Sequence, residues 1–413
     1  MATISPFRPY RYTAKAGAPL ASLVTQPYDK ISPTMQERYL AASPYNLVRV
    51  ILGKPAPDDH PLDNVYTRAA CNLNDWTCAG VLEQEQEPSL YAYLQEFTDP
   101  DSRERLVRKG FIGLGKVEDY SAGVVHRHEQ TLSGPKKDRL ELVRHTLAHF
   151  GQLFMLYPDP AREIDAILDE AASGAPIGEV NDEYGAAHRL WKISDPATVA
   201  NIQALMRDKK LVIADGHHRY ETALAFSKEC PLGGAEHVMM TFVNMHSDGL
   251  RILATHRIVR NLEGFNPAAL LAKLAGCGTV SLMTVGEFKK LSAAYDPAKL
   301  VLGVALAGQE KIHVLEAPRK GLDVIFLHKD VLEGALGIGE EAVREQKYLT
   351  YVRGIDAAVE EVTRKGAQAA FLLQPTRVQE VADTSFGGGV MPQKSTDFYP
   401  KLLSGLTVYK IEP

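Results

Sequence analysis

The segment Leu211-Val-Ile-Ala-Asp-Gly-His-His-Arg-Tyr-Glu-Thr-Ala-Leu224 carries the strongest structural signal in the chain. Four apolar residues end at Asp215-Gly216, and a helical pattern begins after Arg219. This order predicts a buried strand followed by a turn at the N-terminus of a helix. The free N–H groups and the positive dipole end of such a helix favour an anion, and Gly216 permits a tight turn or close ligand approach.

Five polar residues crowd this turn. His217, His218 and Arg219 can donate hydrogen bonds, whereas Asp215 and Glu221 can act as a base or bind a cation such as magnesium. The alternative is an ordinary strand–turn–helix corner with packed or exposed histidines. Because the five residues lie within about seven positions, we favour a site that handles phosphate.

The composition describes an ordinary globular protein. Of 413 residues, 45% are hydrophobic and 23% charged, and the net charge of −5 gives no support for nucleic-acid binding. No apolar run approaches the roughly 20 residues of a membrane span, and the N-terminus lacks signal-peptide features. We therefore expect a cytoplasmic protein without membrane contact. The cysteines predict reduced thiols rather than disulfides or a zinc site: Cys71, Cys78, Cys230 and Cys277.

Strands and helices alternate without a regular βαβ series, which predicts the α+β class. One expected unit has a strand over 189–193, a helix opened by Asp195-Pro196, and a strand over 210–214. Two adjacent strands are expected over 238–246 and 251–259, around the turn Ser247-Asp248-Gly249. The domain boundary is expected near residue 265, giving a phosphate-binding region 1–265 and an α/β region 266–413.

Polar groups also gather elsewhere in the chain. The stretch 125–139 contains His128, Glu129, Thr131 and Arg139, and it is compatible with a phosphate or metal site or with a solvated loop. His256-Arg257 interrupts an apolar strand, so these residues either lie at an edge or face the same anion as Arg219.

Two further segments leave alternatives open. The glycine-rich segment ending in Lys394-Ser395-Thr396 differs from a P-loop because Gln393 replaces the second glycine, so it either binds phosphate in another geometry or is a flexible loop. Asp29 is either a turn residue or a catalytic carboxylate.

Together these pieces resemble the domain of unknown function 1015 family. The matching residues run through the chain in order: Pro6-Phe7-Arg8, Pro27-Tyr28-Asp29, Asn46 to Arg49, His128-Glu129-x-Thr131, Asp138-Arg139, Ala214 to Ala223, Thr255-His256-Arg257 and Met391-Pro-x-Lys-Ser-Thr396. The Asp215–Arg219 core is also similar to the nucleotide-binding motif of the ParB/sulfiredoxin superfamily, which includes free-serine kinases.

This resemblance implies a ParB/sulfiredoxin-like nucleotide-binding core. It assigns phosphate binding to Gly216, His217, His218 and Arg219, and it leaves Asp29, Glu129 and Asp215 as candidate bases. Sulfiredoxin chemistry is disfavoured because this turn has no cysteine.

We expect a phosphotransferase that uses a nucleotide or pyrophosphate with Mg²⁺ held by Asp215, acting on a small molecule such as free serine or phosphoserine. Glu221, His128, Thr131, Arg139, His256, Arg257, Lys394, Ser395 and Thr396 would contact substrate or phosphate. The alternatives are a phosphatase or nucleotidase and a nucleotide-binding regulator without turnover. A homodimer is a candidate oligomeric state for this protein.

Overall fold

The computed structural model of the chain describes residues 1–129 and 133–412, which form two compact units. Unit 1 comprises residues 1–127, 131–250 and 400–413, and unit 2 comprises residues 128–130 and 251–399. The α+β class expected from the sequence is confirmed, with a mixed sheet in unit 1. The division differs from the expected boundary near residue 265, because the strand over 255–259 pairs inside the second unit and the C-terminal residues return to the first.

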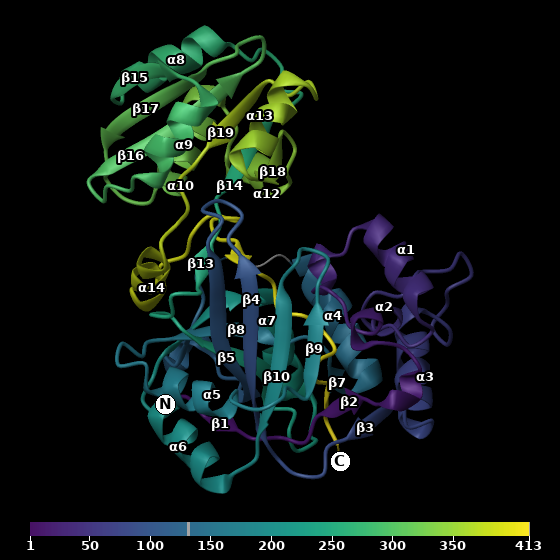
Figure 1. Cartoon of the computed structure of the whole chain (residues 1–413). Coiled ribbons are helices and arrows are strands. Elements are labelled where there is room, and N and C mark those ends of the chain that lie inside the picture. Colours follow the sequence, from purple (N-terminus) through teal and green to yellow (C-terminus); the bar gives the residue numbers. More distant parts are fainter. Residues whose placement is uncertain (130–132, 413) are drawn as a thin grey trace. The chain divides into compact units, whose positions relative to one another are not determined.

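Unit 1 is built on a nine-stranded mixed sheet in the order β6-β11-β8-β12-β5-β4-β10-β9, with β1 beside β5 (Figure 1). Its parallel pairs are β11–β6 and β12–β8. The strands are β1 Ile4–Ser5, β4 Leu90–Thr98, β5 Arg105–Lys116, β6 Val125–His126, β8 Leu153–Tyr157, β9 Gly178–Asn181, β10 Ala187–Ile193, β11 Leu211–Asp215 and β12 His237–Asn244.

Helices cover this sheet and extend from one edge of the unit. Apolar residues of α5, α6 and α7, including Leu168, Ile202 and Tyr220, share a core with the strands. The helices are α1 Pro33–Ala42, α2 Val48–Ile51, α3 Val65–Cys78, α4 Ser133–Thr146, α5 Glu163–Ala171, α6 Pro196–Met206 and α7 His217–Glu229. Two short ribbons complete the unit, β2 Tyr10–Tyr12 with β3 Leu82–Gln84, and β7 Ala148–His149 with β21 Tyr409–Lys410.

Unit 2 has a six-stranded antiparallel sheet in the order β15-β17-β16-β19-β14-β18. Alternation along β16 sends Leu302 to the core that contains α8 and Val301 to the core that contains α9 and α13, so both faces are covered (Figure 1). The strands are β14 Thr255–Val259, β15 Thr279–Met283, β16 Lys299–Leu306, β17 Ile312–Pro318, β18 Leu349–Arg353 and β19 Ala369–Leu372. A separate ribbon pairs β13 Arg251–Ile252 with β20 Phe398–Tyr399.

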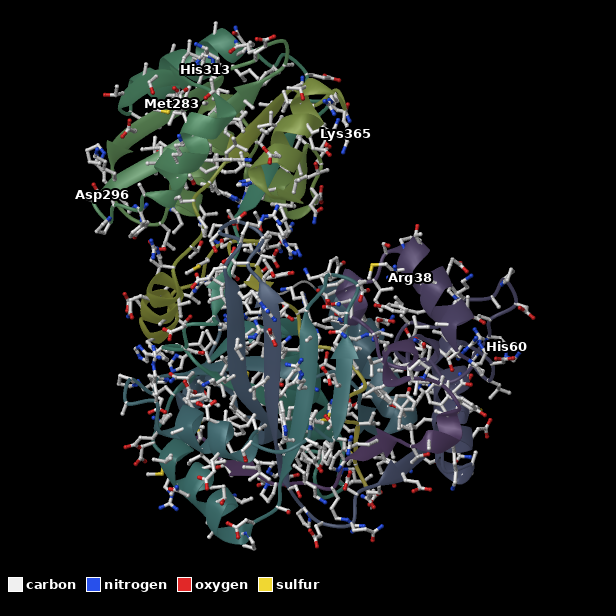
Figure 2. All side chains as sticks on the ribbon, viewed as in Figure 1. Arg38, His60, Met283, Asp296, His313 and Lys365 are labelled. Carbon is white, nitrogen blue, oxygen red and sulfur yellow. The ribbon has the colours of Figure 1, made fainter. Side chains whose placement is uncertain are left out.

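The helical segments of unit 2 include a π-helix over Leu327–Glu333. The α-helices are α8 Pro267–Ala275, α9 Val285–Ala293, α10 Asp323–Phe326, α11 Gly334–Leu336, α12 Glu340–Arg344, α13 Ile355–Thr363 and α14 Val378–Phe386. Charged side chains are found on the outside of both units, as Arg38 of unit 1 and Lys365 of unit 2 illustrate (Figure 2). None of the helices in the described ranges combines the length and apolar character required to cross a bilayer.

One prediction about neighbouring strands is wrong. The segments 238–246 and 251–259 were expected to be adjacent, but β12 pairs with β5 and β8 in unit 1 whereas β14 pairs with β18 and β19 in unit 2. The reason is that the chain leaves unit 1 between these two strands, so the Ser247–Gly249 turn does not close a hairpin. Strands β16 and β17, in contrast, are consecutive in the chain and pair antiparallel.

Candidate functional site

The polar cluster of unit 1 begins where β11 ends at Asp215. The chain turns at Gly216, whose φ of 99° favours glycine, and α7 starts at His217. The N-terminus of α7 has no side-chain cap, whereas α6 is capped by Asp195. The strand–turn–helix geometry predicted from the sequence is therefore confirmed, and its first turn offers backbone donors.

Asp215 is shared by two cations. Its Oδ2 accepts a hydrogen bond from Nη2 of Arg219 at 2.8 Å, and its Oδ1 lies 3.3 Å from Nζ of Lys401. Burial acts to raise the pKa of this carboxyl. The positive charges of Lys401 and Arg219 outweigh burial and hold the pKa well below its usual range, with smaller contributions from Lys30 and His217. Asp215 is therefore ionised at physiological pH.

Arg219 is held from both sides. Besides Asp215, its Nη1 donates to the carbonyl oxygen of Gln152 at 2.6 Å. Gln152 is itself 1% exposed, and its Oε1 accepts from the hydroxyl of Thr241. The guanidinium is thus fixed by one partner at the end of β11 and another next to β8.

Lys401 reaches this turn because the C-terminal segment is anchored in unit 1. Gln95 donates from Nε2 to the carbonyl oxygen of Lys401 at 2.9 Å, and Arg108 donates from Nη2 to that of Pro400 at 2.5 Å. Nε of Arg108 also donates to Oε1 of Gln95. Burial lowers the pKa of Arg108 to about 9, against the opposing influence of Tyr93 and Asp215.

Asp29 and Arg139 belong to the same neighbourhood. Tyr28 stacks with the Arg139 guanidinium at 4.1 Å from its ring centroid. Burial raises the pKa of Tyr28, and the charges of Asp29, Arg139 and Arg219 all act on this hydroxyl. Tyr28, Arg139 and Arg219 line one cavity, whereas the carboxylate of Asp29 pairs with Nζ of Lys30 at 3.8 Å. A common site for Asp29, Arg139 and Arg219 stays a prediction.

The other predicted residues of this turn are arranged differently. His217 is buried and His218 half-buried. Glu221 forms ion pairs with Lys136 and, at 3.9 Å, with Arg127, so its contacts lie on α4 and the end of β6 rather than with Arg219.

A second group of predicted residues lies in unit 2. Nε2 of the fully buried His128 is 2.7 Å from Oγ1 of Thr396. Oε1 of Glu129 accepts from the backbone N–H of Lys394 at 3.4 Å, and Met391 donates to the carbonyl of His128. His128, Glu129 and the Met391–Thr396 loop are therefore brought together within unit 2. Thr131 lies outside the described residues.

Arg257 braces the same loop from β14. Its Nη2 donates to the carbonyl oxygen of Lys394 at 3.1 Å, and burial lowers its pKa to about 10 against the influence of Tyr351 and Glu129. His256 accepts the backbone N–H of Leu373, and burial with the nearby Arg257 lowers its pKa to about 3. Ser395 donates to the carbonyl of Pro392. Phosphate contacts by these residues stay a prediction.

The magnesium predicted at Asp215 fits the donor set poorly. Both oxygens of this carboxylate face cations, and the described residues contain no group of three or more His, Cys, Asp or Glu side chains arranged to hold a metal ion. The geometry instead makes Asp215 a group that positions Arg219 and Lys401. The four cysteines are free thiols, as expected.

Two residues of the cluster were missed by the sequence analysis, Lys401 and Lys30. Lys401 is 9% exposed and stands alone among the apolar residues of 398–403. An isolated lysine in an apolar run signals a buried charge that needs a partner, and this signal could have found it.

Comparisons with known proteins place the chain in a family. The family model described as "Protein of unknown function (DUF1015)" matches residues 4–348. No curated protein matches the sequence.

Solved structures to which the chain is similar include the following three. A free serine kinase in complex with AMP is 10% identical, with 68% of this chain and 89% of that chain covered at a TM-score of 0.34. SbnI with C-terminal truncation, from Staphylococcus aureus, is 10% identical, with 71% and 87% covered at 0.33. A conserved hypothetical protein from Pyrococcus furiosus is 11% identical, with 67% and 87% covered at 0.34.

Proposed function

The chain belongs to the DUF1015 family, whose name assigns no activity, and we propose that it is a nucleotide- or pyrophosphate-dependent phosphotransferase acting on a small hydroxylated metabolite. The phosphate would bind at the β11–α7 turn of unit 1. Free serine is the first acceptor to test, because the motif from Asp215 to Arg219 resembles that of free-serine kinases.

One observation carries this proposal: a single carboxylate is matched by two cations beside an uncapped helix N-terminus. Asp215 supplies one negative charge, while Arg219 and the largely buried Lys401 both contact it. A phosphate bound here would accept hydrogen bonds from both cations and add negative charge beside them. The first-turn N–H groups of α7, where the described residues provide no side-chain cap, are neutral donors that suit the same ligand.

The residues divide the chemical work as follows. Arg219 and Lys401 offset charge on the transferred phosphoryl group, and Asp215 holds both in place. Asp215 is a poor base because its cations stabilise the ionised form. Asp29, which lies in the same unit, would accept the proton of the attacking hydroxyl.

Phosphorus NMR of the purified protein tests this proposal. ATP, ADP and pyrophosphate are each incubated with protein and Mg²⁺, with and without serine. A new phosphoester signal that requires serine supports phosphotransfer. Inorganic phosphate released equally without serine would identify a phosphatase, and bound but unchanged nucleotide would identify a regulator; both results contradict phosphotransfer.

The base is tested separately with the variant Asp29→Asn. We expect turnover to fall by at least about a hundredfold while nucleotide affinity stays unchanged, because the carboxylate acts on the acceptor hydroxyl rather than on the donor phosphates. Turnover equal to that of the unmodified protein would remove Asp29 from the mechanism. The matched variant Asp58→Asn, in the proline-rich loop of unit 1, should leave both quantities unchanged.

A further inference from the structure

A cavity of about 50 Å³ lies in unit 1, among α4, α7 and the segment that begins with β7. Arg139 of α4 and Arg219 and Thr222 of α7 line it, together with His149. The remaining walls are largely apolar, with Phe150 as an example. Arg219 therefore has two roles in the unit: its guanidinium donates a hydrogen bond to Asp215, and it also lines this cavity.

Two buried polar atoms of the lining have no hydrogen-bond partner among the residues that the structure describes. They are Nε2 of His149, a residue 8% exposed, and Oγ1 of Thr222, a residue 3% exposed. A helical threonine hydroxyl commonly bonds the carbonyl four residues earlier, and Thr222 does not. Buried polar atoms are nearly always satisfied, so two in one cavity indicate that a ligand or solvent completes them.

The charge of the lining indicates which ligand fits. Among the described residues that line the cavity, two are arginines and none is an aspartate or glutamate. Burial lowers the pKa of His149 to about 4, so its ring is neutral at pH 7 and one tautomer presents Nε2–H as a donor. Guanidinium, imidazole and hydroxyl groups together suit an oxyanion.

We propose that this cavity binds the oxyanion head group of a small substrate, a carboxylate or a phosphate group. A water molecule needs about 10–15 Å³ of such space, so the cavity takes about three to five non-hydrogen atoms. The proposal rests on the proposed function in one respect: Arg219 would contact the phosphate donor at the Asp215 turn and the second ligand here. The bound group would thus lie next to the phosphate site.

The test titrates acetate and inorganic phosphate into the full chain and follows the ring signals of His149 by NMR. Two variants alter the lining of the cavity. Thr222→Val keeps the shape of the side chain and removes the hydroxyl. Gly151→Ala adds a Cβ about 3.1 Å from both Nη1 of Arg219 and Oγ of Ser404, which narrows the space. The control variants are Ser227→Ala on α7 and Gly233→Ala, where an added Cβ meets no atom within 4 Å.

We expect saturable binding of at least one anion, weakened about tenfold or more by Thr222→Val and Gly151→Ala and unchanged in both controls. Tighter binding of acetate would identify a carboxylate, and tighter binding of phosphate would identify a phosphate group. ADP affinity should stay unchanged in Thr222→Val. Absence of saturable binding, or wild-type affinity in folded Thr222→Val and Gly151→Ala, would overturn the cavity site. If the unmodified protein does not bind ADP, that result would overturn the proposed function instead.

Discussion

At the scale of single residues, Asp215 and its cations show which parts of a site a sequence can reveal. The pair Asp215–Arg219 is separated by four positions, so one strand end and one helical turn predict their contact. Lys401 lies 186 positions from Asp215, and only the return of the C-terminal segment to unit 1 brings them together. Local spacing predicts local contacts, whereas long-range partners depend on the tertiary fold.

The variant Asp215→Asn tests this arrangement. It leaves Arg219 and Lys401 without their shared countercharge, so we expect the free energy of unfolding to fall by about 3 kcal/mol. Pyrophosphate should restore more thermal stability to this variant than to the unmodified protein, because the ligand supplies the missing negative charge. Thermal melts with and without pyrophosphate measure both effects.

The control is Asp119→Asn, which removes an exposed ion pair with Lys228 and should leave the thermal melting temperature unchanged. An Asp215→Asn protein as stable as the control would show that the two cations do not depend on this carboxylate.

At the scale of elements, most strands and helices were predictable, and their pairing was less so. The helix after Asp195 and the strand expected over 210–214 match α6 and β11, because capping residues and apolar runs are local signals. It was not predictable that β12 and β14 pair with strands of different units, since nothing local shows that the chain changes units at residue 250. The same limit applies to the cluster of unit 2, where His128 and Thr396 meet across 268 positions.

The turn between β11 and α7 gives a prediction at this scale. In Gly216→Ala the backbone keeps a φ near 99°, and the new Cβ would lie 2.9 Å from Cδ2 of Leu153 and 3.1 Å from Nη2 of Arg219. We expect a loss of about 2–3 kcal/mol in unfolding free energy and weaker ADP binding, because Arg219 must move.

Gly185→Ala is the matched control. Its φ of 82° imposes the same kind of strain, but an added Cβ meets no atom within 4 Å. Chemical denaturation should show a loss of only about 1 kcal/mol, with ADP affinity unchanged. Equal losses in the two variants would mean that contact with Arg219 contributes nothing.

At the scale of the whole molecule, each unit has its own apolar core and its own buried neutral histidines. Burial lowers the pKa of His149 in unit 1 to about 4, and that of His328 in unit 2 to about 3 with help from Arg257. Below the unfolded value near 6.5, the unfolded chain binds protons that the folded chain does not. Folding stability is therefore retained above pH 6.5 and falls as the pH drops towards these lowered values.

We expect each such histidine to reduce the free energy of unfolding by about 1.4 kcal/mol per pH unit below pH 6.5. Denaturant titrations between pH 7.5 and 5 should show this slope, and it should decrease in His149→Gln. The variant of the exposed residue His60 (Figure 2), His60→Gln, should keep the slope of the unmodified protein. A His149→Gln slope identical to that of His60→Gln would contradict the account.

The most direct test of the phosphate site at the β11–α7 turn is calorimetric titration of ADP into the unmodified protein, Lys401→Met and the control Lys228→Met. Lys228 is also on unit 1 but pairs at the surface with Asp119. We predict that the unmodified protein and the control bind ADP equally, and that Lys401→Met, folded by circular dichroism, binds about a hundredfold more weakly. Equal affinity in all three proteins, or no binding by the unmodified protein, would contradict a phosphate site at Asp215, Arg219 and Lys401.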